Sequence, residues 1–428
     1  MTGPLIDLGE LRHGPEPDPL PRPPRANGRQ LRCALVLLLV LATLAAAAGP
    51  PPPRVVVTLP ARPGADVMVD GDLFLVVEPT NISTRQGRLA AYRLPGGEPV
   101  WQAPLSAEAQ YWGVTLLAGM LLATGYEIGP ERRETLTVAL DRATGAYRWQ
   151  QPGSAYKLAD GNVLLRTGGE TEPSSLRAVD PCCGTVRWQL PATVAEVSIR
   201  DTGHGVDRVV LNQVDGPVEV RDATTGGLLV RADLRPPDGG PIGLDLTTDL
   251  LLAIDRGAGT VTAYGLDQLD RRWARAGVIV DFALDCGPVL CMRAGQNELQ
   301  AVDAATGELR WRNTRWGWAW PYDGRLIVNV LGSADGPEHF VVLDPLTGRE
   351  LADLGRWDLY QLSAGGRLVG TRRHPDGGVL VGEVDVRAGK VRVLDVLPEA
   401  TGDCQAITGH LVCGAPPAGA YRIWKLPD

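Results

Sequence analysis

The eleven residues "AVDAATGELRW" (residues 301–311) decide the fold, because their pattern returns along the chain. "ALDRATGAYRW" ends at Trp149 and "AVDPCCGTVRW" ends at Trp188, with aspartate, glycine and tryptophan at the same offsets. Self-similarity at a fixed interval is typical of repeat architectures. The residues that define the motif in its clearest copies are Asp141, Gly145, Trp149, Asp180, Gly184, Trp188, Asp303, Gly307, Trp311, Asp344 and Gly348.

Weaker copies extend the repeat over most of the chain. "VLDPLTGRELA" has Ala352 where the tryptophan is expected, while "VRDATTGGLLV" and "EVDVRAGKVRV" also keep only the aspartate and the glycine. "AYRLPGGEPVW" and "AYGLDQLDRRW" instead keep the tryptophan, as Trp101 and Trp273. Units therefore recur at intervals of roughly 40 residues.

Each unit reads as four short strands. Apolar runs such as "NVLLRT" and "RLIVNV" precede the motif and are bounded by Gly, Asp and Asn. Within the motif, the aspartate can accept turn N–H groups and the glycine can supply the positive φ that a hairpin turn requires. The tryptophan then offers a large flat surface for packing between neighbouring units. We therefore predict an all-β fold, a β-propeller of four-stranded blades.

The chain also contains a way to close the ring. The last unit supplies "QAITGHLVCGA" and "YRIWKLPD" but no outgoing strand, and "RVVVTL" (residues 54–59) precedes the first unit with no other use. We expect this segment to complete the last blade and so to remove a sheet edge. Eight units carry the motif, and we predict eight blades, with nine as the alternative.

The pattern A-x-D-x-x-T-G-x-x-x-W resembles the repeat of PQQ-like (quinoprotein-type) β-propellers of bacteria, and it covers nearly all of residues 54–428. That group includes quinoprotein alcohol dehydrogenases, the BamB-like propellers of the outer-membrane barrel assembly machinery, and exported sensor domains of kinases. Because its members range from enzymes to protein scaffolds, the resemblance implies the fold and leaves the function open.

A quinoprotein dehydrogenase would require particular cofactor-binding residues, and the sequence can be searched for them. By resemblance, those enzymes hold the quinone PQQ against a vicinal disulfide in a loop that faces the cofactor, beside a metal bound by carboxylates and an amide. Here Cys182 and Cys183 replace residues of the repeat's own turn, and no acidic-amide set or C-x-x-C-H haem site stands out. We therefore expect no enzyme, no catalytic residue, no metal and no cofactor; a PQQ-dependent dehydrogenase is the alternative.

The first 53 residues predict a membrane anchor. Residues 1–30 are rich in proline and arginine and are expected to be disordered and cytoplasmic. Residues 31–49 form an apolar run near the lower limit for a transmembrane helix, with positive charges before it, and residues 50–53 form a proline-rich linker. A cleavable signal peptide is the alternative, which would give a secreted propeller. In both cases the domain 54–428 lies outside the cytoplasm.

The six cysteines of the exported part suggest disulfides. Cys286 and Cys291, like Cys404 and Cys413, are expected to bridge the first two strands of a unit in equivalent places. Cys182 and Cys183 are then left for each other; we expect them to be joined, with two free thiols as the alternative.

"RWGWAWPYDG" places Trp316, Trp318 and Trp320 at alternate positions, so a regular strand would point all three to one side. Packing between blades is the structural interpretation, and a platform for a ligand or a partner is the functional one. The net charge of −8 and the lack of a basic cluster beyond residue 32 argue against nucleic acid. We expect a membrane-anchored extracytoplasmic scaffold that binds an envelope protein or ligand.

Overall fold

The computed structural model describes residues 32–40, 57–61, 65–81, 86–106, 109–117, 119–128, 133–168, 174–213, 216–236, 240, 242–295, 297–332, 337–361, 366–407, 409–416 and 419–426. The chain divides into two compact units, Met1–Arg54 and Val55–Asp428. The segments expected to be a disordered tail (1–30) and a linker (50–53) lie outside the described residues.

In the first unit, residues 32–40 form an α-helix within the predicted transmembrane segment 31–49, whose other residues are not described. Among the described residues, no helix has the length and the apolar character needed to cross a membrane.

The second unit consists of strands that pair antiparallel with their neighbours in the chain within each sheet, except for β1, which pairs with β35. The strands are β1 (Val57–Pro60), β2 (Asp66–Asp70), β3 (Leu73–Asn81), β4 (Gln86–Arg93), β5 (Glu98–Ser106), β6 (Ala109–Leu117), β7 (Met120–Ile128), β8 (Arg133–Asp141), β9 (Tyr147–Pro152), β10 (Ser154–Lys157), β11 (Val163–Thr167), β12 (Ser174–Val179), β13 (Val186–Asp201), β14 (Val206–Gln213), β15 (Val218–Asp222), β16 (Leu228–Ala232), β17 (Gly243–Leu246) and β18 (Leu250–Asp255). They continue with β19 (Thr260–Gly265), β20 (Arg271–Ala276), β21 (Val280–Asp285), β22 (Val289–Ala294), β23 (Glu298–Asp303), β24 (Leu309–Asn313), β25 (Trp316–Tyr322), β26 (Arg325–Val330), β27 (His339–Leu343), β28 (Glu350–Arg356), β29 (Asp358–Gln361), β30 (Leu368–Arg373), β31 (Val379–Asp385), β32 (Lys390–Leu397), β33 (Gly402–Ile407), β34 (His410–Ala415) and β35 (Ala420–Lys425).

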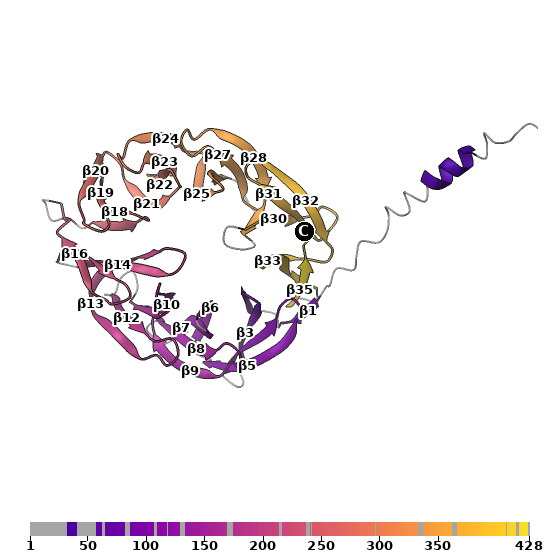
Figure 1. The fold of residues 1–428 in the computed structure, drawn as a ribbon, viewed down its shortest axis with the longest axis horizontal. Helices are drawn as coiled ribbons and strands as arrows, with labels where there is room; N and C mark the ends of the chain where they lie inside the picture. Colours follow the sequence, from indigo (N-terminus) through magenta and orange to yellow (C-terminus); the bar gives the residue numbers. More distant parts are fainter. Residues whose placement is uncertain are drawn as a thin grey trace, which may run out of the picture. The chain divides into compact units, whose positions relative to one another are not determined.

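These strands form the nine four-stranded blades of a β-propeller, arranged in a ring (Figure 1). Blades 1 to 8 begin with β2, β6, β10, β13, β17, β21, β25 and β29, and blade 9 begins with β33. The all-β propeller is thus confirmed, but the preferred count of eight blades is wrong. The incomplete last unit becomes a full blade of its own, so it adds one to the eight units that carry the motif.

Blades 3 and 4 share a strand. The sixteen residues of β13 pair with β12 in their first part and with β14 in their last part, which joins the two blades into one seven-stranded sheet. Elsewhere a loop leads from the outermost strand of one blade to the innermost strand of the next.

The ring is closed by the start of the second unit. β1 pairs antiparallel with β35, with Val57 opposite Ile423 and Leu59 opposite Tyr421, and so forms the outermost strand of blade 9. Blade 9 also contacts blade 1 directly, because the Gln405 side-chain amide donates to the Val67 carbonyl at 2.7 Å. The predicted closure by residues 54–59 is confirmed for the described residues 57–59.

The hydrophobic core is divided among the blade interfaces. Among the described residues, nine clusters of buried side chains are present, and each lies between two neighbouring blades. The cluster between blades 9 and 1, for example, contains Leu59, Phe74 and Val412. Because each sheet buries both of its faces, the strands read as nearly continuous apolar runs in the sequence.

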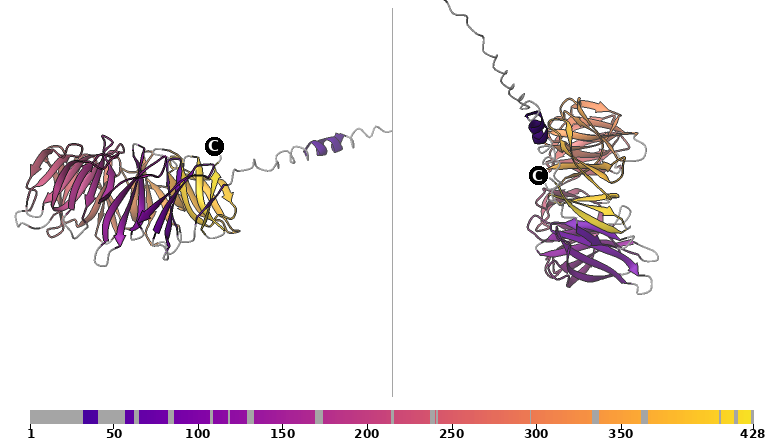
Figure 2. Two further views of the ribbon diagram at one scale, coloured as in Figure 1. Left: turned by 90° about the horizontal axis from the view of Figure 1, so that it is seen from below. Right: turned by 90° about the vertical axis from the view of Figure 1, so that its right-hand side faces the viewer.

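The two ends of the propeller differ in sequence. Every innermost strand starts at the same end, which we call the loop end, and the strands run between the two ends (Figure 2). The Asp-x-x-Thr-Gly turns join the third and fourth strands of a blade and therefore lie at the opposite end, the turn end.

Candidate binding surface

The motif residues have structural roles at the turn end. Asp303 Oδ1 accepts the backbone N–H groups of Ala305 and Thr306 at 3.0 and 2.9 Å. Arg310, which directly precedes Trp311, donates to Asp303 Oδ2 at 2.7 Å. Together with Thr306, this ion pair lowers the pKa of Asp303 to about 2. Arg148 does the same for Asp141 at 2.7 Å and lowers its pKa to about 2.

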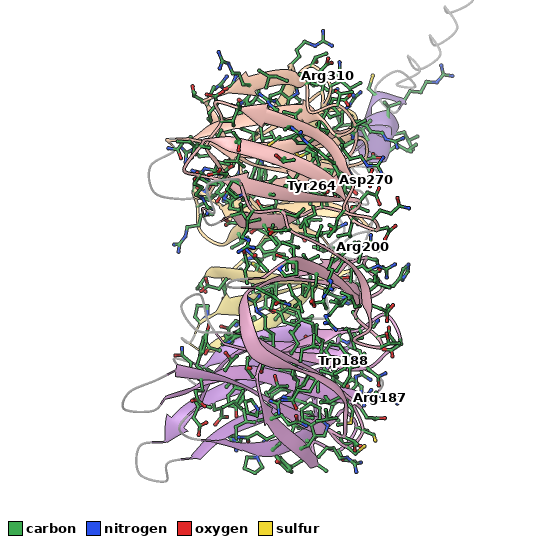
Figure 3. The ribbon with its side chains drawn as sticks, turned by 90° about the vertical axis from the view of Figure 1, so that its left-hand side faces the viewer. Arg187, Trp188, Arg200, Tyr264, Asp270 and Arg310 are labelled. Atoms are coloured by element: carbon green, nitrogen blue, oxygen red, sulfur yellow. A yellow bond between two sulfur atoms is a disulfide. The ribbon has the colours of Figure 1, made fainter. Side chains whose placement is uncertain are left out.

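The motif tryptophans connect each blade to the next. Trp311 Nε1 donates to the carbonyl oxygen of Pro345 at 2.8 Å, and Trp149 Nε1 donates to that of Pro181 at 2.9 Å. The turn glycine must be small, because a Cβ on Gly348 would lie 2.5 Å from the Trp311 ring. Gly348 also has a φ of 65°, in the left-handed region that favours glycine. Figure 3 shows another motif tryptophan, Trp188, beside Arg187 on β13.

The three tryptophans expected on one side of a strand point in different directions. A register shift between Trp316 and Ala319 interrupts the pairing of β25 with β26, so the alternation predicted for a regular strand is lost. Trp316 is 4% exposed and packs edge-on against Trp311, with ring centroids 5.9 Å apart. Trp320 packs against Phe340. A platform of three tryptophans is therefore not formed.

Trp318 lies in this bulge and is 52% exposed. Its ring stacks on Phe282 of β21, the innermost strand of the neighbouring blade, with centroids 4.5 Å apart and planes at 17°. Its backbone N–H donates to Asn329 Oδ1 at 2.5 Å, which holds the bulge in place. The bulge thus turns one tryptophan out of the interface and toward solvent near the loop end.

Blade 2 repeats this arrangement. Trp112 lies at a register shift between Tyr111 and Gly113 of β6, and it is 51% exposed. Its neighbour Tyr126 is exposed as well, and the two ring centroids are 5.9 Å apart. The sequence-based prediction missed Trp112, although "YWG" and "GWA" both place an aromatic residue beside glycine near the start of an innermost strand.

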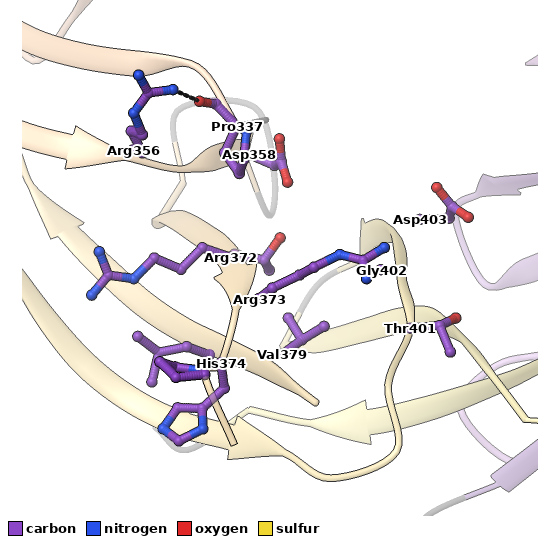
Figure 4. A pocket seen from close by; sticks show the side chains of 13 residues that line it. Pro337, Arg356, Asp358, Arg372, Arg373, His374, Val379, Thr401, Gly402 and Asp403 are labelled. Atoms are coloured by element: carbon purple, nitrogen blue, oxygen red, sulfur yellow. Dashed lines mark hydrogen bonds between the residues drawn. The ribbon is translucent and has the colours of Figure 1, made fainter. Parts of the chain in front are cut away.

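A cavity of about 880 Å³ also opens at the loop end, between blades 7, 8 and 9 (Figure 4). Arg372 and Arg373 end β30, His374 follows them, and Asp403 comes from β33. The Arg372 guanidinium lies 4.4 Å from the centroid of the Trp357 ring. Partial burial, followed by the negative charge of Asp403, raises the pKa of Asp358 in this wall. The cavity therefore presents both signs of charge.

The cysteines form two of the three expected pairs. The disulfides Cys286–Cys291 and Cys404–Cys413 are present, as predicted. They do not occupy equivalent places: the first closes the turn after β21, whereas Cys404 lies near the start of β33, at the other end of its hairpin.

The third pair is not joined. Cys182 and Cys183 are exposed free thiols whose Sγ atoms lie 2.7 Å apart, so the predicted vicinal disulfide is absent from the structure. They occupy the turn between β12 and β13, the two outer strands of blade 3. A quinone against this pair would be in solvent instead of being enclosed by the blades. The pair therefore does not fit the quinone-contacting disulfide of the dehydrogenases.

Comparison with known proteins agrees with the repeat. Residues 85–276 match the family model described as outer membrane protein assembly factor BamB. Within these residues the propeller carries PQQ-like repeats. Among curated proteins, no relative of this PQQ-like propeller was found.

Solved structures with similar folds include BamB from Moraxella catarrhalis, at 15% identity over 87% of this chain and 98% of that chain, with a TM-score of 0.45. The computationally designed protein Ika8 matches at 15% identity over 74% of this chain and 96% of that chain, with a TM-score of 0.45. The C-terminal WD40 domain of Sif2 matches at 12% identity over 87% and 97%, with a TM-score of 0.43. No function is inferred from these matches.

Proposed function

We propose that this PQQ-like propeller is a non-catalytic scaffold of the cell envelope that binds a partner protein with its loop end. The observation that carries the proposal is the pair of exposed tryptophans, Trp112 and Trp318, each presented by a bulge on an innermost strand. The description of the matching family model, an outer membrane protein assembly factor, supports a role in assembly at the envelope.

Exposed, positioned aromatic side chains are typical of protein interfaces. A tryptophan that is held rigidly loses little conformational entropy on binding and contributes a large apolar area. Trp318 is held by its stack on Phe282 and by the backbone bond to Asn329, so its orientation is set before a partner arrives. Bulges of this kind are common next to functional sites, because they redirect a side chain that the sheet would otherwise bury.

The charged cavity adds a polar component at the same end of the ring. Arg373, His374, Asp358 and Asp403 all line it, so an extended segment of a partner with charges of both signs would find complementary groups. Trp318 belongs to blade 7, which also forms part of this cavity, whereas Trp112 lies in blade 2. Apolar anchors together with polar contacts match the usual composition of a transient protein interface.

The proposal includes a membrane tether. Residues 31–49 are apolar and follow a segment rich in arginine, which favours an N-terminus in the cytoplasm and a propeller outside it. Mass spectrometry of the mature N-terminus tests this point, because cleavage near Ala48 would produce a secreted propeller instead.

Affinity capture with the tagged full chain, after cross-linking in cells, tests the scaffold function. Trp112→Ala combined with Trp318→Ala should reduce recovery of the partner about tenfold or more, since two interface tryptophans each contribute roughly 2 kcal/mol. Tyr147→Ala is the matched control. Tyr147 is an aromatic residue that is 63% exposed, but it lies at the start of β9, at the turn end of the propeller and away from the proposed surface. Equal recovery from the double variant and the wild type, or no partner above a tag-only control, would contradict the proposal.

A further inference from the structure

Cys182 and Cys183 hold two exposed thiols on one turn of blade 3. Their Sγ atoms lie 2.7 Å apart, and a carboxylate oxygen of Asp180 lies within 4.8 Å of both. Within the part of the chain that the structure describes, these three residues form the one group of three histidine, cysteine or acidic side chains with ligand atoms this close together.

The repeat itself does not require these thiols. Corresponding turns have Ala305 and Thr306, or Leu346 and Thr347, in the two positions, and each threonine hydroxyl donates to the turn aspartate. The turn of blade 3 has no threonine, and its Cys182 N–H donates to Asp180 Oδ1 at 3.0 Å, as the Ala305 N–H does to Asp303.

The support beneath the turn is also complete. Trp149 Nε1 donates to the carbonyl oxygen of Pro181, and the Trp149 ring packs against Gly184, which has a φ of 68°. Both neighbours of the cysteine pair therefore contact Trp149 of the preceding blade. Neither sulfur atom takes part in this support, and both are exposed to solvent.

We propose that Cys182 and Cys183 form a dithiol site that binds trivalent arsenic compounds. Thiolates are soft ligands that select thiophilic Lewis acids over hard cations. A tetrahedral zinc ion with Zn–S bonds of about 2.3 Å would hold two sulfurs roughly 3.8 Å apart. Trivalent arsenic is pyramidal, with a sulfur–arsenic–sulfur angle nearer to 90°, so it suits the shorter separation of this pair better.

The two thiols differ in acidity, which sets the order of reaction. The hydrogen bond from the Cys182 thiol lowers the pKa of Cys183, and the same bond, together with Asp180, raises the pKa of Cys182 to about 12. Cys183 is therefore the first nucleophile, because the thiolate is the reactive form. Hydrogen bonds from Cys182 and from Arg187 lower the pKa of Asp180, so this carboxylate is too weak a base to take the proton. Cys182 reacts second, and its proton leaves with the arsenic-bound oxygen as water.

The reaction with phenylarsine oxide balances without an oxidant. Two S–H bonds and the arsenic–oxygen bonds break, two As–S bonds form, and the oxygen leaves as water with both thiol protons. Arsenic stays trivalent throughout. The product is a ring that contains both sulfur atoms and one arsenic atom.

Intact-mass spectrometry of the full chain tests the site. The protein is treated with a mild monothiol, which leaves the buried disulfides Cys286–Cys291 and Cys404–Cys413 intact, and then with one equivalent of phenylarsine oxide. We expect one adduct that survives excess monothiol and is removed by 2,3-dimercaptopropanol. An adduct on the single thiol of Cys33 would be displaced by the monothiol.

Two variants complete the experiment. Cys182→Ala with Cys183→Thr recreates the Ala-Thr turn of blade 6, so it should fold like the wild type by circular dichroism and should form no stable adduct. Cys33→Ser should keep the adduct. Failure of the wild type to retain arsenic, or retention by the folded Ala-Thr variant, would overturn the proposal; neither result depends on the scaffold function.

Discussion

Trp311→Ala should destabilise the propeller strongly, because one side chain joins two blades. Trp311 is 8% exposed, contacts Gly348 in the next blade, and packs edge-on against Trp316. Truncation of a buried tryptophan costs about 3–5 kcal/mol through lost packing and the cavity that remains. That range includes about 1 kcal/mol for the hydrogen bond from Nε1 to the Pro345 carbonyl.

The variant is still expected to fold, because the chain contains a natural precedent. Ala352 occupies the corresponding position in blade 7 and faces Gly389 in blade 8. At that interface Trp357 fills the space instead, and a Cβ on either Gly370 or Gly382 would lie 3.0 Å from its ring. Trp311→Ala has no such replacement, so the full cost should be measured.

Urea unfolding followed by circular dichroism gives the change in the free energy of unfolding. Trp311→Phe should lose about 1–3 kcal/mol, since the ring packing is largely kept while the Pro345 carbonyl loses its donor. Trp318→Ala is the control from the same pair of blades; it should lose about 1 kcal/mol, mainly its stack on Phe282. The reasoning is refuted if Trp311→Ala loses less than about 1 kcal/mol or no more than Trp318→Ala.

Three further outcomes are expected. Replacing both Cys404 and Cys413 by serine should lower the free energy of unfolding by about 2.5 kcal/mol, as loop closure over a separation of 9 residues implies; urea unfolding that matches the wild type would contradict this. Asp303 has a pKa lowered to about 2, so its stabilising effect is present above the unfolded pKa of about 4 and is lost as the pH falls toward 2. The melting temperature of Asp303→Asn should therefore fall less steeply than that of the wild type between about pH 4 and pH 2. Identical slopes would count against the ion pair. Burial raises the pKa of Asp245, which accepts the Ala283 N–H at 2.8 Å. Its contribution to stability is therefore present below the unfolded pKa and is lost as the pH rises through the folded pKa. Asp245→Asn should make the melting temperature depend less on pH above about pH 4, and a steeper decline would refute the assignment.

The repeat allowed the fold and its local contacts to be predicted. The spacing of Asp303, Gly307 and Trp311 specifies a turn, a left-handed glycine and a docking side chain, and each role is met in the structure. These roles involve residues close in sequence or one repeat away, so the same interactions recur in every good copy of the motif. The closing strand was also predictable, because a propeller edge without a partner would be exposed.

The candidate site could be predicted only in part. The sequence drew attention to Trp318, but it grouped that residue with Trp316 and Trp320, which the structure packs against Trp311 and Phe340. The error came from assuming a regular strand: a single bulge moves every later side chain to the opposite face. No local sequence pattern predicts the bulge, which depends on the pairing of β25 with β26.

By itself, the sequence determined an all-β propeller with a repeated Asp-x-x-Thr-Gly turn, the chemistry of those turns, two of its disulfides and the strand that closes it. The tertiary structure alone decided that the blades number nine, that Trp112 and Trp318 face solvent, and that charged residues of three blades line one cavity. The physical reason lies in the range of the interactions. Turn geometry and repeat spacing are encoded within about 40 residues, whereas exposure at the loop end depends on strand register and on contacts between separate blades.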